Sequence, residues 1–221
     1  MSARDDIFSG IRRSLGVTGR EATRISAVAH RLSTRPVGVI PARGQGDPDM
    51  RLKTFMEEAQ RVSASVVTLS SADDVPAEVA RLLAESSLQP QIRMGLDVRL
   101  ARLDWAAAGL SVATGPSRGD DPTSVSHAFA GVAETGSLVV LSGPDNPATL
   151  NYLPDNHIVL LSAADLHADL EAVWTALRAA TGGSLPRTIN VITGPSRSAD
   201  IEQTLLLGAH GPRRLHILVT G

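Results

Sequence analysis

The sequence predicts an α/β fold in which a mostly parallel β-sheet is covered by helices on both faces. Two observations support this: short apolar segments alternate with amphipathic segments between residues 66 and 113, and 43% of the 221 residues are hydrophobic. Alternating strands and helices are typical of parallel sheets, whose strands are buried between layers of helices. A chain of this length and apolar content can form one domain with a substantial core.

The individual elements are predicted from the spacing of apolar residues. Ile7, Ile11 and Leu15 are four residues apart and predict a helix over residues 4–15. Residues 17–48 show no clear periodicity and are expected to form a long connection. One helix starts near Asp49, with others at 74–86, 97–103, 125–132 and 163–180, and strands are expected at 66–69, 91–94, 110–113, 137–141, 157–161, 188–193 and 215–219. The chain therefore divides into residues 1–46, an N-terminal helix with a flexible connection, and residues 47–221, the α/β domain.

The composition argues against several functional classes. The formal net charge is −2 and the isoelectric point is near 6.3, whereas a nucleic-acid-binding domain usually carries a basic excess. Lys53 is the only lysine, which argues against P-loop and Schiff-base chemistry. The absence of cysteine excludes disulfides, a thiol nucleophile and cysteine-ligated iron–sulfur clusters in this chain. The N-terminus is too charged for a signal peptide, and no apolar run approaches a membrane span, so we expect a soluble, cytoplasmic protein.

The segment from Val191 to Gly211 predicts a strand, a Gly-Pro turn and the start of a helix. Such a turn can leave backbone N–H groups directed at an anion. The anion-binding candidates here are Gly194, Ser196, Arg197 and Ser198. The alternative is a capped structural turn without a ligand. The pentapeptide TGPSR occurs at 114–118 and again at 193–197, each time after a predicted strand, and a shared turn chemistry is the simplest explanation.

Glu134 is the first catalytic candidate, because a carboxylate directly before Thr135-Gly136 at a predicted strand start is hard to explain by packing. It could act as a general base or nucleophile. His210, in the turn before the last strand, is a second candidate, as a proton carrier. Thr135, Gly136, Ser142 and Gly143 complete the candidate anion site. The alternative for Glu134 is a carboxylate satisfied by nearby backbone N–H groups or an arginine.

The other histidines are weaker candidates. His157 starts a predicted strand and His127 lies close to Glu134 in sequence, so both remain possible functional groups. No pair of histidines has the spacing of a metal site, and no metal is expected. The remaining histidines (His30, His167 and His216) are interpreted as surface or packing residues, and Asp165 and Asp169 as a solvated helix face.

Three motifs resemble one known family. They are AETGSLVVLSGP at 133–144, LPDNHIVLL at 153–161 and ITGPSRSADIEQTLLLGAHGPRRLHILV at 192–219. Together they are similar to the LUD-domain (DUF162) family of lactate utilisation proteins. The resemblance implies a fold similar to the NagB/RpiA/CoA-transferase group and a role in oxidising L-lactate to pyruvate with iron–sulfur partner proteins.

On that interpretation this chain is a non-redox subunit without a cofactor of its own, and it binds a small organic acid or anion. Its N-terminal helix would then serve for docking. The alternative is an independent isomerase or transferase of the same fold group, acting on a phosphorylated or CoA-linked substrate. In that case Glu134 would be the nucleophile or base, with Arg197 or His210 in the same crevice.

Overall fold

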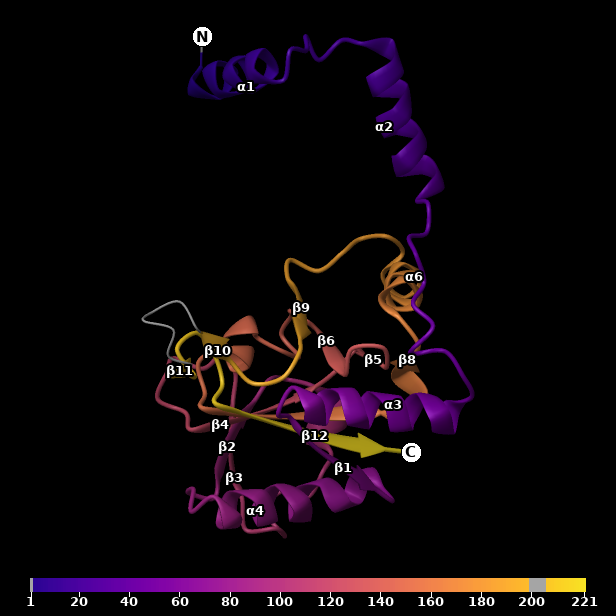
Figure 1. Cartoon of the computed structure of the whole chain (residues 1–221). Coiled ribbons are helices and arrows are strands. Elements are labelled where there is room, and N and C mark those ends of the chain that lie inside the picture. Colours follow the sequence, from indigo (N-terminus) through magenta and orange to yellow (C-terminus); the bar gives the residue numbers. More distant parts are fainter. Residues whose placement is uncertain (1, 199–205) are drawn as a thin grey trace. The chain divides into compact units, whose positions relative to one another are not determined.

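The computed structural model describes residues 2–198 and 206–221 and divides the chain into two units, Met1–Ile40 and Pro41–Gly221 (Figure 1). The first unit holds the helices α1 (Ala3–Ser14) and α2 (Ala22–Thr34), neither of which has a buried residue. Among the described residues, no helix combines the length and the apolar character needed to cross a bilayer.

Helix α2 lies where the sequence predicted an irregular connection, so that expectation is wrong for Ala22–Thr34. Ile25, Val28 and Leu32 repeat at intervals of three and four residues, and no proline or glycine interrupts the segment. This spacing is the amphipathic pattern of a helix. The helix ends where Arg35 adopts a left-handed conformation with φ of 46°.

The second unit is built on a six-stranded sheet in which all neighbouring strands are parallel. In spatial order its strands are β1 (Ser65–Leu69), β12 (Arg214–Thr220), β7 (Asn156–Ser162), β4 (Thr123–His127), β2 (Gln91–Met94) and β3 (Ser111–Thr114). The predicted α/β fold with a mostly parallel sheet is confirmed. The three central strands β12, β7 and β4 are buried along most of their length, as expected for a sheet covered on both faces.

A smaller sheet contains four strands. In spatial order they are β8 (Leu166–His167), β5 (Ala130–Val132), β6 (Ser137–Leu141) and β9 (Ile189–Ile192). β6 pairs antiparallel with both β5 and β9, whereas β5 and β8 are parallel. The strands at 137–141 and 188–193 were therefore predicted correctly as strands, but they belong to this second sheet.

The layers follow from the alternation of side chains along the strands. On β7, Val159 packs in a cluster with Phe55 of α3 (Pro48–Arg61), whereas Ile158 packs in a cluster with Val79 of α4 (Val75–Glu85). Consequently α3 and α4 cover opposite faces of the six-stranded sheet (Figure 1). The small sheet lies on the α3 side, and its Val139 packs with helix α6 (Leu170–Thr181). The shorter helical elements are α5 (Val98–Ala101), η1 (Ala72–Asp74), η2 (Ala148–Asn151) and η3 (Ala163–Asp165).

Two predicted helices are wrong. Residues 125–132 form the end of β4 and all of β5, although their apolar residues have helical spacing. The predicted helix at 163–180 is divided into η3, β8 and α6. Asp169 is therefore the buried N-cap of α6, where its carboxylate accepts a hydrogen bond of 2.8 Å from the backbone N–H of Ala172, and it does not belong to a solvated helix face.

The helix predicted after Gly194-Pro195 is also not found in the described residues. Arg197–Ser198 (β10) and Leu206–Leu207 (β11) pair as antiparallel strands. Residues 199–205, which carry the rest of that prediction, lie outside the described residues.

Candidate functional site

The strand order of the large sheet defines a switch point between β2 and β4. Along the chain, β2 is followed by β3 on one side of the pair, whereas β4 is followed within this sheet by β7 on the other side. The carboxyl ends of the two strands, Met94 and His127, therefore continue in opposite directions. In open parallel sheets, ligands bind in the crevice outside the carboxyl ends of strands at such a point.

A cavity of about 330 Å³ lies at this switch point. Ligand sites in proteins commonly have volumes of this size. Its walls come from the segment after β2, the end of β4, the loop after β6 and the segment after α6. The lining residues are Asp97, Arg99, His127, Phe129, Leu141, Ser142, Gly143, Asp145, Asn146, Thr181, Ser184 and Pro186.

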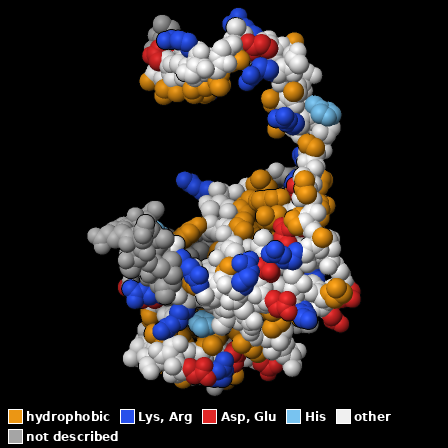
Figure 2. All heavy atoms as spheres, viewed as in Figure 1, with side chains coloured by type: hydrophobic (Ala, Val, Ile, Leu, Met, Phe, Trp, Pro, Cys, Tyr) orange, Lys and Arg blue, Asp and Glu red, His pale blue; other side chains and the backbone are white. Residues whose placement is uncertain are grey.

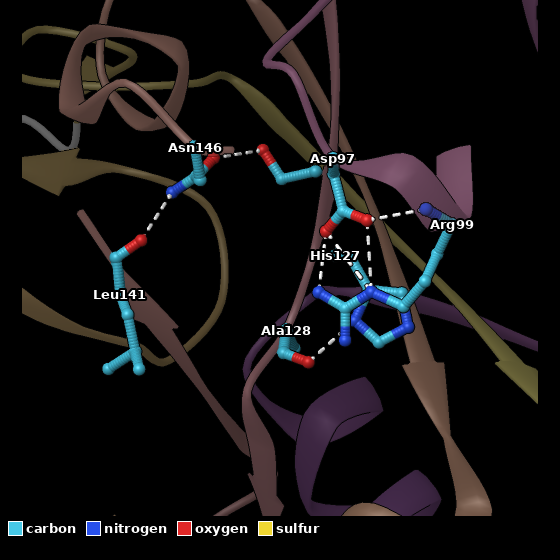
Figure 3. Close-up of polar contacts among 7 residues, drawn as sticks. Asp97, Arg99, His127, Ala128, Leu141 and Asn146 are labelled. Carbon is cyan, nitrogen blue, oxygen red and sulfur yellow. Dashed lines mark hydrogen bonds and ion pairs between the residues drawn. The ribbon is translucent and has the colours of Figure 1, made fainter. Parts of the chain in front are cut away.

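Asp97 and Arg99 form an ion pair on one wall of the cavity (Figure 3). Asp97 is 3% exposed and is the N-cap of α5, where its carboxylate accepts a hydrogen bond of 2.8 Å from the backbone N–H of Arg99. Nε and Nη2 of Arg99 donate to the same carboxylate at 2.9 and 2.5 Å. Burial raises the pKa of Asp97, but hydrogen bonds from Arg99 outweigh this effect and hold the pKa below its ordinary value. Asp97 is therefore ionised and anchors a half-exposed guanidinium.

His127 presents a neutral imidazole to the same cavity. Its Nδ1 lies 2.8 Å from the carbonyl oxygen of Ala128 (Figure 3). Because a carbonyl oxygen only accepts, Nδ1 carries the proton and Nε2 has a free lone pair. Burial lowers the pKa of His127, and the positive charge of Arg99 lowers it further. The cavity thus combines a fixed cation and a neutral hydrogen-bond acceptor with the carboxyl groups of Asp97 and Asp145.

A chain of buried hydrogen bonds supports the wall formed by Asn146. Nδ2 of Asn146 donates to the carbonyl oxygen of Leu141, so its Oδ1 is the acceptor for the hydroxyl of Ser126 at 2.8 Å (Figure 3). The oxygen of Ser126 then accepts from Nε2 of His157 at 3.0 Å. His157 is fully buried, and Nδ1 has no hydrogen-bond partner among the described residues. This arrangement fixes the orientation of the Asn146 amide.

Of the residues predicted to bind an anion, Ser142 and Gly143 line this cavity. Ser142 also joins β6 to the start of β9, because its N–H donates to Thr188 and its hydroxyl oxygen accepts from the N–H of Thr188. Gly143 and Asn146 exchange two backbone hydrogen bonds of 3.2 Å. The loop that carries Ser142 and Gly143 is therefore a closed turn at the edge of the cavity.

Glu134 lies elsewhere, in the turn between β5 and β6. It is 9% exposed, and its Oε1 accepts a hydrogen bond of 3.4 Å from the backbone N–H of Leu170, the first residue of α6. The positive end of a helix dipole stabilises a carboxylate in this position. Its Oε2 is buried and has no hydrogen-bond partner among the described residues.

Most of the other predicted residues gather over the C-terminal end of α3. Thr135 begins a chain of hydroxyl contacts of 2.8 and 2.7 Å through Ser137 to Thr193. A Cβ on Gly136 would lie 2.1 Å from the backbone nitrogen of Ala59, and φ at Gly136 is 63°. These contacts place the Thr135-Gly136 turn directly against α3.

Gly194 and Arg197 contact the same end of α3. A Cβ on Gly194 would lie 2.4 Å from the carbonyl oxygen of Val62, and Nη2 of Arg197 donates to the hydroxyl of Ser63. The hydroxyl of Ser196 accepts from the N–H of the exposed His210 at 3.3 Å. The side chain of Ser198 lies outside the described part of the chain.

The two catalytic candidates, Glu134 and His210, have different neighbours. Glu134 contacts the start of α6, and His210 contacts Ser196. Neither residue lines the cavity at the switch point. Sequence reasoning did not select Asp97, Arg99 or Asn146. Asp97 and Arg99 directly follow the predicted strand at 91–94, so the rule that sites lie at strand carboxyl ends could have found them.

Comparisons with known proteins agree with this fold. A family model described as the LUD domain matches residues 52–220. A lactate utilization protein C from an Exiguobacterium species is 29% identical, over 98% of this chain and 95% of its own length. Another, from Halalkalibacterium halodurans, is 40% identical over 40% of this chain and 39% of its own length. An uncharacterised protein of Neisseria meningitidis serogroup B is 38% identical over 42% of this chain and 40% of its own length. The matches to the last two relatives thus span about two fifths of their length.

A solved structure has the same fold. The crystal structure of a DUF162 family protein from Deinococcus radiodurans aligns with a TM-score of 0.62 and 19% identity, covering 80% of this chain and 100% of that chain. The similarity to the NagB/RpiA/CoA-transferase group stays a prediction.

Proposed function

The chain belongs to the LUD-domain family, and on that basis we propose that it acts in lactate utilisation as a non-redox subunit that binds a small organic acid. The name of the relative that aligns along nearly the whole chain, lactate utilization protein C, supports the metabolic role. The cavity at the switch point between β2 and β4 supports binding of the acid.

The choice of ligand rests on one observation: the anchored guanidinium of Arg99 and the neutral imidazole of His127 line the same cavity. Asp97 binds Nε and Nη2 of Arg99, so Nη1 is left to donate to a carboxylate. Nε2 of His127 can accept a hydrogen bond from a hydroxyl on the neighbouring carbon. A 2-hydroxy acid such as L-lactate carries these two groups side by side. In this role the chain binds and orients the acid, and Nε2 can take the hydroxyl proton when the acid is oxidised.

Oxidation of lactate to pyruvate also requires an acceptor for two electrons and for the hydrogen on the hydroxyl-bearing carbon, which we assign to partner proteins. The chain has no cysteine that could ligate an iron–sulfur cluster. The redox centres would therefore belong to iron–sulfur partners, and this subunit would hold the acid for them.

Isothermal titration of the full chain with L-lactate and pyruvate tests this proposal. Replacing Arg99 with Met keeps most of the aliphatic stem but removes the charge, and it should weaken binding at least tenfold, the loss of about 1.4 kcal/mol expected for a charged hydrogen bond. Arg102→Met, at an exposed arginine just after α5, is the matched control and should bind like the wild type. Saturable binding that Arg99→Met leaves unchanged would contradict the proposed site.

The alternative is an isomerase or transferase that acts on a phosphorylated or CoA-linked substrate. Its support is Glu134, whose buried Oε2 has no hydrogen-bond partner among the described residues. The same titration with coenzyme A and sugar phosphates distinguishes the two functions. Binding of such a compound that is lost in Glu134→Gln but kept in Arg99→Met would favour the alternative.

A further inference from the structure

Helix α1 carries an apolar face that the rest of its own unit, Met1–Ile40, does not bury. The side chains on this face are Ile7, Phe8, Ile11 and Leu15, which are 63, 42, 48 and 61% exposed. At about 100° per residue they fall within one quarter to one third of the helix circumference. Figure 2 shows hydrophobic side chains gathered along one side of this helix.

The helix is specified locally even though it has no buried residue. Ser2 and Asp5 form a capping box, in which the N–H and the hydroxyl of Ser2 donate to Oδ2 of Asp5. The guanidinium groups of Arg4 and Arg12 lie 5.3 and 5.8 Å from the centre of the Phe8 ring. An isolated helix of 12 residues is nevertheless marginal in water, so this face gains stability only when a partner covers it.

The charges at the edge of the face identify the partner. Asp5 in the first turn and Arg12 in the last turn lie on the same edge, so the helix is acidic at one end of this edge and basic at the other. An antiparallel pair of such helices places opposite charges together at both ends. We propose that α1 pairs antiparallel with α1 of a second copy of this chain, through the face formed by Ile7, Phe8, Ile11 and Leu15.

The spacing of the face sets the register of the pair. Of this face, Phe8, Ile11 and Leu15 repeat at intervals of three and four residues, which is the pattern of core positions in a coiled coil. Arg4 lies four residues before Phe8 and continues this line at the polar end of the helix. Placing Phe8 against Ile11 of the partner subunit brings Arg4 beside Leu15 of the partner subunit. Asp5 then lies within one turn of the partner's Arg12.

Helix α2 does not have this property, although it also carries an apolar stripe. Ile25, Val28 and Leu32 are 56, 55 and 71% exposed. Within the helix, the charged residues beside this stripe, Arg24 and Arg31, are both basic, so two copies of α2 would repel each other along it. The acidic N-cap, Glu21, already accepts hydrogen bonds from Thr18 and Gly19. The self-complementary pattern is therefore specific to α1.

Sedimentation equilibrium of the full chain tests the proposal. A helix of 12 residues gives a small interface, so we expect a weak dimer with a Kd on the order of micromolar. Ile11→Asp removes two side chains from the symmetric interface and should raise the Kd about 100-fold. Ser9→Asp introduces the same charge on the opposite side of the helix and should leave the dimer unchanged. A chain that stays monomeric up to about 1 mM, or equal effects of the two variants, would overturn the proposal.

Cross-linking tests the antiparallel direction, because the chain has no cysteine of its own. Arg4→Cys and Leu15→Cys are prepared as separate full-length proteins with different masses. In the proposed pair, position 4 faces position 15 of the partner subunit, so oxidation of a mixture should give the mixed disulfide dimer. Either variant alone should cross-link poorly, because its two thiols lie about 16 Å apart along the helices. Efficient cross-linking within each variant, or no cross-linking in the mixture, would contradict the pairing.

Discussion

His157 should make the stability of the fold depend on pH in a way that a single substitution can isolate. The side chain is fully buried in β7, and burial lowers its pKa from 6.5 to about 3. In the unfolded chain the same imidazole returns to its ordinary pKa. Between these two values the unfolded state binds a proton that the folded state does not bind. The contribution of His157 to the free energy of unfolding is therefore complete at neutral pH and is lost as the pH falls below about 6.5.

The size of the effect follows from the two pKa values. Each pH unit between them costs about 1.4 kcal/mol of the free energy of unfolding. At pH 5, which is about 1.5 units below the unfolded pKa, the loss due to His157 is about 2 kcal/mol relative to pH 8. This loss is a large fraction of the net stability of an ordinary domain.

The informative variant is His157→Gln, because the Nε2 amide of glutamine can still donate to the hydroxyl of Ser126 but does not titrate. Guanidinium unfolding of the wild type and the variant at pH 8 and pH 5 gives the comparison. The wild type should lose about 2 kcal/mol more than the variant between these pH values. His30→Gln, at an exposed histidine of α2, is the matched control and should follow the wild type. Equal losses in the wild type and His157→Gln would refute this reasoning.

Two glycines give further predictions. Gly136→Ala should lower the free energy of unfolding by at least about 2 kcal/mol, because φ is 63° and the new Cβ would lie 2.1 Å from the backbone nitrogen of Ala59. Gly143→Ala is its control in thermal unfolding, since a Cβ there meets nothing within 4 Å. Gly95→Ala should weaken binding of the organic acid and also lower the melting temperature, because its Cβ would lie 1.9 Å from the carbonyl oxygen of Asp145 in the cavity wall. An unchanged Kd in Gly95→Ala would show that this wall does not contribute to the site.

The strands of the large sheet were predictable because their apolar runs are bounded by turns. The strands at 66–69, 91–94 and 215–219 match β1, β2 and β12 to within one residue at each end. What the spacing cannot reveal is the partner of each strand. In the second, mixed sheet, Ser137–Leu141 pairs antiparallel with Ile189–Ile192, about 50 residues away. The spacing of apolar residues reports only on neighbours in the sequence, whereas the pairing of strands in a sheet joins residues that are far apart in the sequence.

The error at 125–132 has the same origin. Val125, Ala128, Phe129 and Val132 are spaced as on a helix, and local propensity therefore favoured that interpretation. In the fold, β4 is an inner strand between β7 and β2, so its side chains are buried on both faces. Buried serines are tolerated there because the hydroxyl of Ser124 donates to the carbonyl oxygen of Leu150 at 2.6 Å and that of Ser126 donates to Asn146. These hydrogen bonds to residues 20 and 26 positions later in the sequence stabilise residues 123–127 as a strand.

The repeated TGPSR motif shows what such a local pattern does establish. The glycine of each copy has a positive φ, 103° at Gly115 and 77° at Gly194. Gly115 directly follows the last residue of β3, and Gly194 lies two residues after the last residue of β9. The two copies therefore share a turn chemistry that glycine permits. Their surroundings differ, because a Cβ on Gly115 would meet nothing within 4 Å, whereas one on Gly194 would lie 2.4 Å from Val62.

The position of Glu134 illustrates the corresponding limit for a candidate site. Its sequence context, a carboxylate before Thr-Gly, correctly indicated a turn at the start of the strand at 137–141. The element before the turn was predicted as a helix but is β5, and the neighbour that decides the role of Glu134 is Leu170, 36 residues later. A carboxylate at a helix N-terminus is stabilised whether or not a ligand binds, so its burial alone does not select a function. Arg99 differs because Asp97 fixes its position and leaves one donor, Nη1, without a hydrogen bond in the described part of the chain. The cavity with Arg99 lies outside the carboxyl ends of two strands at the switch point of the sheet, whereas α6 already provides a partner for one carboxylate oxygen of Glu134. For this reason the cavity between β2 and β4 is the stronger candidate.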